Sequence, residues 1–186
     1  MIAIQDVKKL SPEDYLLQEK TNLVKHEYIN GEVYEMAGAS SAHVTISLNI
    51  ASSLKNHLRG GKCRVYISDM KVRIDSQNVF YYPDVIVTCS DEDKGFSYYK
   101  KSPQVIIEVL SDSTESFDRG DKFADYRKIE SLREYVLISQ SKKRVDLFRK
   151  EDDNSWRLES FSEKENLGIK SINFNCAVAT LYEDLD

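Results

Sequence analysis

The sequence lacks long apolar runs, and no stretch approaches the roughly 20 residues that a membrane-spanning helix needs. The first residues, Met1–Asp6, show no basic region followed by an apolar one, so we expect no signal peptide and a cytoplasmic chain. Glycine and proline are scarce, and no repeat, low-complexity tract or flexible linker is visible. These absences predict one domain over residues 1–186.

Cysteine is scarce as well. The three cysteines, Cys63, Cys89 and Cys176, lie far apart and show no CxxC spacing. This pattern argues against a zinc site, and the odd count suits a reducing compartment better than a disulfide framework. We therefore expect each cysteine to be a small buried hydrophobic side chain.

A basic surface is also missing. The formal net charge is -5, whereas proteins that wrap nucleic acid usually carry excess lysine and arginine. The charge argues against tight, non-specific DNA binding. It does not exclude a nuclease, because a cluster of metal-binding carboxylates is itself acidic and a bound metal offsets part of that charge.

Local signals define the N-terminal third. The run Ser11–Asp14 combines an N-cap serine, a first-turn proline and acidic residues, which predicts a helix to about Lys20. Asn30-Gly31 between two short runs predicts a β-hairpin, because both turn positions must accept positive φ. Apolar residues at helical spacing predict an amphipathic helix from Ala42 to Leu58. Its expected buried face is formed by Val44, Leu48, Ala51, Leu54 and Leu58.

Apolar runs predict the rest of the fold. Residues 79–87 and 105–110 are nearly continuously apolar, as in strands covered on both faces. A helix is expected over 118–129, and an edge hairpin with a closing segment over 155–186. Further strands are expected at 63–67, 70–74, 134–138 and 144–148. The order predicts an α/β (α+β) fold, with a mixed central sheet flanked by helices and preceded by an extra helix and hairpin.

Two carboxylates occupy positions that a plain core strand would not give them. Asp84 directly follows Pro83 at the mouth of an apolar run, and Glu108 interrupts the apolar run Val105–Leu110. Charged groups are almost never fully buried unless they are paired or bind a metal. Taken alone, Asp84 fits a strand-start aspartate equally well, and Glu108 fits a buried ion pair. If the two strands are neighbours, both acids converge and suit Mg²⁺ or Mn²⁺.

Cations follow on the next predicted helix. Arg119, Lys122 and Tyr126 are spaced to share one helical face, and the helix begins within ten residues of Glu108. Lys122 can therefore reach the carboxylates, orient water and stabilise charge on phosphorus. Arg119 and Tyr126 are candidates for binding the substrate. The alternative for Arg119 and Lys122 is a solvated charged face.

These residues carry a family resemblance. The sequence resembles the PD-(D/E)XK nuclease superfamily and is similar, more narrowly, to the Uma-type endonuclease family. The match extends over nearly the whole chain. The segments that carry it are Tyr28–Glu32, His43, Tyr82–Val85, Ile107–Ser111, Asp118–Tyr126 and Glu134–Val136.

The resemblance implies a restriction-endonuclease-like fold and Mg²⁺-dependent hydrolysis of DNA phosphodiester bonds. Asp84 and Glu108 carry over as catalytic metal ligands, with the Val109 backbone carbonyl as a third. The superfamily lysine normally lies two residues after the glutamate, where this sequence has Leu110. Lys122, on the following helix, is the replacement consistent with the family.

Two candidates come from the N-terminal part. Related nucleases often add an acid from an N-terminal element, which makes Glu32 a catalytic candidate; the alternative is a polar position on the hairpin. His43 either contacts a phosphate or is a polar residue at a helix start. Tyr81 and Tyr82 are expected to pack within their strand.

We thus expect a metal-dependent DNA endonuclease. The alternatives are a non-catalytic DNA- or protein-binding module with a vestigial centre, and a hydrolase of small phosphoesters. An approach of Lys122 to Glu108 within hydrogen-bonding distance favours catalysis over the module, and an open cleft favours a polymeric substrate. By analogy with nucleases that cut both strands, we expect a homodimer, supported by sheet edges and the apolar segment Ile172–Phe174.

Overall fold

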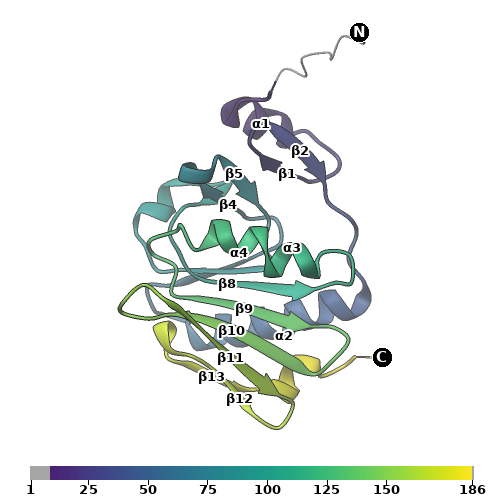
Figure 1. Ribbon diagram of the computed structural model, residues 1–186, viewed down its shortest axis with the longest axis vertical. Helices are drawn as coiled ribbons and strands as arrows, with labels where there is room; N and C mark the ends of the chain where they lie inside the picture. The colour runs from purple at the N-terminus through teal and green to yellow at the C-terminus, as the bar shows by residue number, and fades with distance from the viewer. Residues whose placement is uncertain (1–8, 186) are drawn as a thin grey trace.

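The structure, a computed structural model, describes residues 9–185, so the prediction made for Met1–Asp6 lies outside the described residues. At its centre is a six-stranded sheet in the order β11-β10-β9-β8-β6-β3. Strands β8 and β9 run parallel and the other neighbours in this sheet run antiparallel (Figure 1). The strands are β3 (Arg64–Ile67), β6 (Val85–Thr88), β8 (Pro103–Leu110), β9 (Glu134–Ser139), β10 (Arg144–Lys150) and β11 (Trp156–Ser162).

A second, five-stranded sheet has the order β2-β1-β5-β4-β7 and joins the N-terminal hairpin to the middle of the chain. Only its β4–β7 pair is parallel. A separate antiparallel pair, β12–β13, follows near the C-terminus. The strands are β1 (His26–Ile29), β2 (Glu32–Glu35), β4 (Lys71–Ile74), β5 (Val79–Tyr81), β7 (Tyr99–Lys100), β12 (Asn166–Ile169) and β13 (Phe174–Ala177).

Helices cover both faces of the central sheet. In Figure 1, α3 and α4 lie in front of β8 and α2 lies behind the sheet. The α-helices are α1 (Pro12–Glu19), α2 (Ser41–His57), α3 (Glu115–Arg119) and α4 (Asp121–Tyr126); the short 3-10 helices are η1 (Asp75–Gln77), η2 (Glu92–Gly95), η3 (Lys170–Ile172) and η4 (Val178–Tyr182). Among residues 9–185, none of the helices has the length and apolar content needed to cross a membrane.

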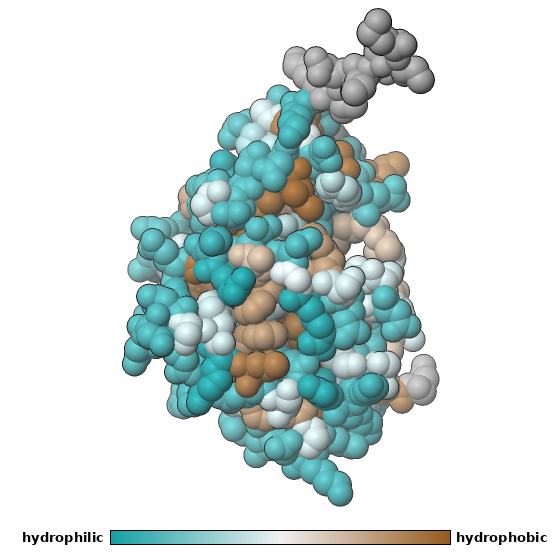
Figure 2. All heavy atoms as spheres, viewed as in Figure 1, coloured by the Kyte–Doolittle hydropathy of each residue, from teal (hydrophilic) through white to brown (hydrophobic). Residues whose placement is uncertain are grey.

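Strand alternation divides the core into two layers around β8. Val105, Ile107 and Val109 pack in the layer that contains α2, and Ile106 packs in the layer that contains α4. Because side chains alternate along a strand, Glu108 points toward the α4 layer. Figure 2 shows that the α3–α4 side of the molecule is mainly hydrophilic, with apolar side chains gathered in a band down its middle.

The N-terminal signals are confirmed. The Ser11 hydroxyl accepts a hydrogen bond from the Asp14 backbone N–H and caps α1. Asn30 and Gly31 have φ values of 52° and 96°, as the tight turn between β1 and β2 requires. The mixed sheet flanked by helices is likewise present, preceded by the expected helix and hairpin.

The single strand predicted over 79–87 is wrong. The chain forms β5 in one sheet and β6 in the other, with Tyr82-Pro83-Asp84 between them. Pro83 has no N–H to donate to a ladder and restricts the residue before it, so the apolar run breaks there. Asp84 is consequently a corner residue between two sheets.

The continuous helix predicted over 118–129 is also wrong. It is split into α3 and α4 at Gly120, whose ψ of -97° departs from helical geometry. Glycine tolerates such a conformation because it has no Cβ. The break takes Arg119 off the face that Lys122 and Tyr126 share.

The predicted extent of α2 is confirmed, but its predicted buried face is only partly right. Ile46, Ile50 and Leu54 are fully buried, whereas Val44 and Leu48 are 55% and 60% exposed. Two residues correspond to a rotation of about 200° around a helix, so the two stripes face opposite ways. The sheet covers only the stripe formed by Ile46, Ile50 and Leu54.

The prediction of three reduced cysteines is wrong. Cys63 and Cys89 form a disulfide. Their pairing follows from the β3–β6 ladder, in which Arg64 lies opposite Thr88, so that the next residues outward meet. Cys176 is free and half-buried, and all three pack at the edge of the core.

The segment expected to support a homodimer lies inside the molecule. Ile172 and Phe174 are buried in the core layer next to α2. Their apolar surface is used within the chain, so this segment offers no face to a second copy.

Candidate active site

A groove of about 1250 Å³ lies between the β1–β2 hairpin, the first half of α2 and the loop that follows β8. Asp84, Glu108 and Lys122 all line it. They come from the start of β6, the end of β8 and helix α4. The antiparallel pairing of β6 with β8 places the two carboxylates next to each other, as their apolar flanks predicted.

Glu108 is the most deeply held acid of the site. Its Oε1 accepts hydrogen bonds from Lys122 Nζ at 3.3 Å and from the Tyr126 hydroxyl at 3.0 Å, and its Oε2 faces the Asp84 backbone N–H at 3.4 Å. Burial raises the pKa of Glu108 well above its usual range, with Lys122 opposing the rise and neighbouring acids adding to it. Such an acid holds its charge only with help from a cation.

Asp84 is tied to both sides of the groove. Its Oδ2 accepts the backbone N–H of Val109 at 2.7 Å, and its Oδ1 lies 2.7 Å from His43 Nε2 on α2. Asp84 and Glu108 are therefore linked reciprocally, each carboxylate receiving a backbone N–H from the other's strand. Val109 also lines the groove, and its backbone N–H is bound to Asp84; the role of its carbonyl as a metal ligand stays a prediction.

His43 contacts the site through Asp84. The Gln140 amide is oriented by donating to the Leu110 carbonyl at 2.7 Å and accepting from the Ser40 hydroxyl at 2.7 Å. Its Nε2 therefore faces His43 Nδ1 as a donor, at 3.4 Å. Since Nδ1 is the acceptor, His43 Nε2–H donates to Asp84. His43, expected either to contact a phosphate or to be a polar residue at a helix start, lies in the first turn of α2 and pairs with the Asp84 carboxylate.

Lys122 is surrounded by acids. Its Nζ lies 3.1 Å from Glu27 Oε1, 3.3 Å from Glu108 Oε1 and 3.3 Å from Asp118 Oδ1. Burial favours the neutral amine, but Glu108, Glu27 and Asp118 raise the pKa of Lys122 above its ordinary value. The acids around it thus favour the charged form of Lys122, in which its Nζ is a hydrogen-bond donor.

Two acids of this cluster escaped the sequence analysis. Glu27, on β1, and Asp118, on α3, are both largely buried and both contact Lys122. Glu27 shares a strand face with Ile29, and an acid that alternates with an apolar residue was the available signal. For Asp118 the signal was its position four residues before Lys122.

Three predicted residues lie elsewhere or act differently. Glu32, on the edge strand β2, is exposed and accepts a hydrogen bond from the Tyr34 hydroxyl at 2.6 Å. Arg119 pairs with Glu115 and Asp146, outside the groove. Tyr126 has no exposed surface, so it supports Glu108 from behind and does not reach a substrate.

The donor set has the chemistry of a site for a hard divalent cation. Three carboxylates, those of Glu27, Glu108 and Asp118, contact one lysine, and Asp84 lies beside Glu108, which leaves excess negative charge in a buried place. Within residues 9–185, no group of three or more His, Cys, Asp or Glu side chains is arranged so that it could hold a metal ion. Mg²⁺ commonly binds through one or two carboxylates and keeps several waters, so a pair of carboxylates such as Asp84 and Glu108 is chemically compatible with this ion.

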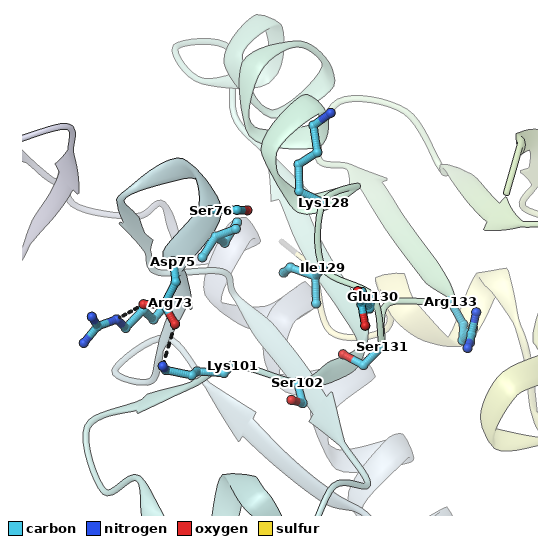
Figure 3. Close-up of a pocket in the computed structure, with 11 residues that line it drawn as sticks. Arg73, Asp75, Ser76, Lys101, Ser102, Lys128, Ile129, Glu130, Ser131 and Arg133 are labelled. Carbon is cyan, nitrogen blue, oxygen red and sulfur yellow. Dashed lines mark hydrogen bonds and ion pairs between the residues drawn. The ribbon is translucent and has the colours of Figure 1, made fainter.

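A second hollow, of about 710 Å³, lies at the opposite end of β8. Arg73 and Lys101 both bind Asp75 there, as the dashed lines in Figure 3 mark. In the same figure Lys128 and Arg133 point in different directions. No predicted site residue lines this hollow, and its cations do not converge on a common point.

Comparison with known proteins finds relatives that extend over most of the chain. The chain is 39% identical over 177 residues to an uncharacterized protein of Synechocystis sp., covering 95% of this chain and 93% of the relative. A second uncharacterized Synechocystis protein is 34% identical over 162 residues, covering 85% and 90%. The crystal structure of "a putative nuclease belonging to DUF820" from Anabaena variabilis superimposes with a TM-score of 0.73 at 15% identity, covering 90% of this chain and 94% of that one.

The predicted restriction-endonuclease-like fold is confirmed by this structural likeness. The family model of Uma2, described as "Putative restriction endonuclease", matches residues 12–179, which span α1 to η4 and include every residue of the cluster. The chain belongs to the Uma2 family.

Proposed function

We propose that the protein is a Mg²⁺-dependent DNA endonuclease that hydrolyses phosphodiester bonds at Asp84, Glu108 and Lys122. The observation that carries the proposal is the 3.3 Å contact between Lys122 Nζ and Glu108 Oε1, next to Asp84 in one groove. Mg²⁺ or Mn²⁺ held by Asp84, Glu108 and the Val109 carbonyl supplies Lewis-acid polarisation of the phosphodiester and lowers the pKa of bound water.

The protein side chains have distinct roles in this proposal. Lys122, as a hydrogen-bond donor, orients the attacking water or stabilises negative charge on the phosphoryl oxygens. Tyr126 and Glu27 position Glu108 and Lys122 from behind, by hydrogen bond and ion pair. His43 fixes the orientation of Asp84. In the reaction, water adds to phosphorus, the bond from phosphorus to one bridging oxygen breaks, and a proton passes to the released alkoxide.

Two other functions are less well supported. The first alternative is a non-catalytic module. Burying Lys122 beside Glu108 costs desolvation free energy, and a module without catalysis gives no functional reason for that cost. A small phosphoester as substrate fits a pocket within about 300–1,000 Å³. The groove exceeds that range at about 1250 Å³, which supports a polymer.

Metal binding and cleavage test the proposal together. Mg²⁺ and Mn²⁺ are titrated by calorimetry into wild type, Asp84→Asn and the control Asp112→Asn, which removes a carboxylate from the same groove outside the cluster. A plasmid-nicking assay follows under the same conditions. We expect binding and nicking in wild type and the control, and neither in Asp84→Asn. Retained nicking in Asp84→Asn contradicts the assignment.

A homodimer stays a prediction for this proposed nuclease. Because Ile172 and Phe174 are buried, an interface has to use other surfaces. Light scattering of the purified chain across a concentration series measures the mass directly.

A further inference from the structure

One stretch of this acidic protein has no negative side chain. From Met36 to Ser68 the sequence contains no aspartate or glutamate, although the chain has 31 acidic residues among 186. The stretch forms α2, the turn that follows it and β3. Its second half contains four exposed cations, which we call the basic segment: Lys55, Arg59, Lys62 and Arg64.

The fold does not neutralise the basic segment. Exposed cations elsewhere pair with acids, as Lys143 does with Glu163. Within residues 9–185 the cations of the basic segment form no such ion pair. Arg59 donates to a neighbouring side-chain amide oxygen and Arg64 donates to backbone carbonyls, and neither contact offsets a charge.

The dipole of α2 accounts for only part of this charge. Lys55 lies in the last turn, where a cation complements the helix dipole. Lys62 and Arg64 follow the helix and gain little from it. The pKa of Asp91 is lowered by its ion pair with Lys94 and more weakly by Lys62, so this nearby acid already has its own partner. A group of uncompensated cations attracts an anionic partner.

One face of α2 connects the active-site groove to the basic segment. Val44 and Leu48 line the groove and are more than half exposed. Ser52 and Lys55, both exposed, continue the same face, because residues three or four positions apart lie above one another on a helix. At 1.5 Å per residue, Val44 and Lys55 are about 16 Å apart along the helix axis. Arg59 follows just past the end of the helix.

The backbone of DNA has the charge and the spacing to follow this face. It presents one phosphate per about 3.4 Å along each strand, so about 16 Å corresponds to about five nucleotides. The groove itself is lined by six acidic residues and by two lysines, Lys25 and Lys122, that are both paired with acids. The phosphates that flank the cleaved bond therefore need cations outside the groove.

We propose that DNA bound at Asp84 and Glu108 continues along the outer face of α2, and that the basic segment binds its backbone about five or more nucleotides from the cleaved bond. This inference deepens the proposed function and rests on it.

Binding is measured by fluorescence anisotropy in EDTA, with a labelled duplex long enough to cover the groove and α2, over a series of salt concentrations. Wild type is compared with Lys55→Gln/Arg59→Gln. The matched control, Lys128→Gln/Lys164→Gln, removes the same charge from two exposed lysines outside the groove and the basic segment.

We expect Lys55→Gln/Arg59→Gln to weaken binding about tenfold or more at about 0.1 M salt, and to lower the slope of log affinity against log salt by about two. The control should stay within about twofold. Equal affinity of wild type and Lys55→Gln/Arg59→Gln overturns the inference, and so does the absence of duplex binding by wild type. An equal loss in the control also overturns it, because net charge alone then sets the affinity.

A charge-preserving variant separates charge from damage to the fold. Lys55→Arg/Arg59→Lys keeps both cations and should bind the duplex as wild type does. A loss as large as that of the glutamine variant overturns the inference. Phosphatidylserine vesicles test a different anionic partner. Vesicle binding that depends on Lys55 and Arg59, without such dependence for the duplex, assigns the basic segment to a membrane surface and likewise overturns the inference.

Cleavage distinguishes this inference from the function beneath it. For an active nuclease, we expect Lys55→Gln/Arg59→Gln to raise KM for the duplex with little change in kcat. Duplex binding that depends on the basic segment, without cleavage by wild type in Mg²⁺ or Mn²⁺, refutes the nuclease and leaves the DNA-binding surface. Cleavage with the same KM in wild type and variant keeps the nuclease and refutes the surface.

Discussion

Lys122 Nζ lies 3.3 Å from Glu108 Oε1, although the lysine comes from α4 and the glutamate from β8, 14 residues earlier. The position two residues after Glu108, where the superfamily places its lysine, holds the buried Leu110. A cation thus reaches the same carboxylate from the helix packed over the strand. Helix α4, which carries the lysine, begins directly after the break at Gly120 that separates it from α3.

Replacing Lys122 tests this relocated lysine. Lys122→Met keeps the side-chain length, and we expect turnover on DNA to fall by roughly 100-fold or more, as on loss of one transition-state donor. Calorimetric Mg²⁺ affinity should change far less, because Asp84 and Glu108 remain. Lys94→Met, at an exposed lysine paired with Asp91, is the control and should leave both quantities unchanged. An equal loss of turnover and affinity means that Lys122 is structural.

Tyr126 and Tyr81 form a matched pair of buried hydroxyls. Tyr126 donates to Glu108 and Tyr81 donates to Asp125, outside the cluster. We expect Tyr126→Phe and Tyr81→Phe each to lower the free energy of unfolding by about 1–2 kcal/mol. Only Tyr126→Phe should lower kcat, because it frees the Glu108 carboxylate to move. Similar kcat values for the two variants would refute a positioning role.

The disulfide gives a stability prediction. Cys63 and Cys89 close a loop with a sequence separation of 26. Changing both to serine should lower the free energy of unfolding by about 2–4 kcal/mol, measured by urea titration. A reducing agent should reproduce the loss in wild type, and Cys176→Ser should not. Absence of any effect from reduction means that the two thiols are not joined in solution.

Asp146 leads to a prediction about how the stability of the fold changes at low pH. Burial works against its charge, but hydrogen bonds from Ser160, Arg119 and Arg144 outweigh burial and hold the pKa of Asp146 below its usual range. A lowered pKa stabilises the fold above the unfolded value of about 3.9, and that stability is lost as pH falls through the folded pKa.

Replacing Arg119 weakens this support of Asp146. We expect Arg119→Gln to cost about 1 kcal/mol near neutral pH, less below the folded pKa, and to leave KM for DNA unchanged. A rise in KM would indicate that Arg119 binds the substrate, as the sequence predicted. Urea titrations at two pH values and steady-state kinetics provide the comparison.

Much of the fold and the centre of the site follow from short-range patterns. The cap at Ser11 and the Asn30-Gly31 turn are local signals that predicted the right helix start and the right hairpin. The acids in apolar runs are local signals as well, and Asp84 and Glu108 lie in one groove. Lys122 was predicted because a buried glutamate needs a cation nearby. Each of these signals lies within a short stretch of sequence and needs no knowledge of which distant residues pack against it.

The errors share a dependence on long-range packing. Glu27, not Glu32, contacts Lys122, because the second sheet sets which hairpin acid faces the groove. The exposure of Val44 and Leu48 depends on which of two apolar stripes the sheet covers. The Cys63–Cys89 bond depends on the β3–β6 register. Residue spacing along the chain does not encode these choices.

The reciprocal bonds between Asp84 and the Glu108–Val109 stretch also bear on how this family can change in sequence. Slipping β6 against β8 by one residue would turn Glu108 toward α2 and break both bonds at once. Residues 89–102, which connect the two strands, are tied by no such bond to Asp84 or Glu108. The spacing of the two acids therefore depends on the β6–β8 register, while the connection is held separately, by the Cys63–Cys89 disulfide and the β4–β7 pair.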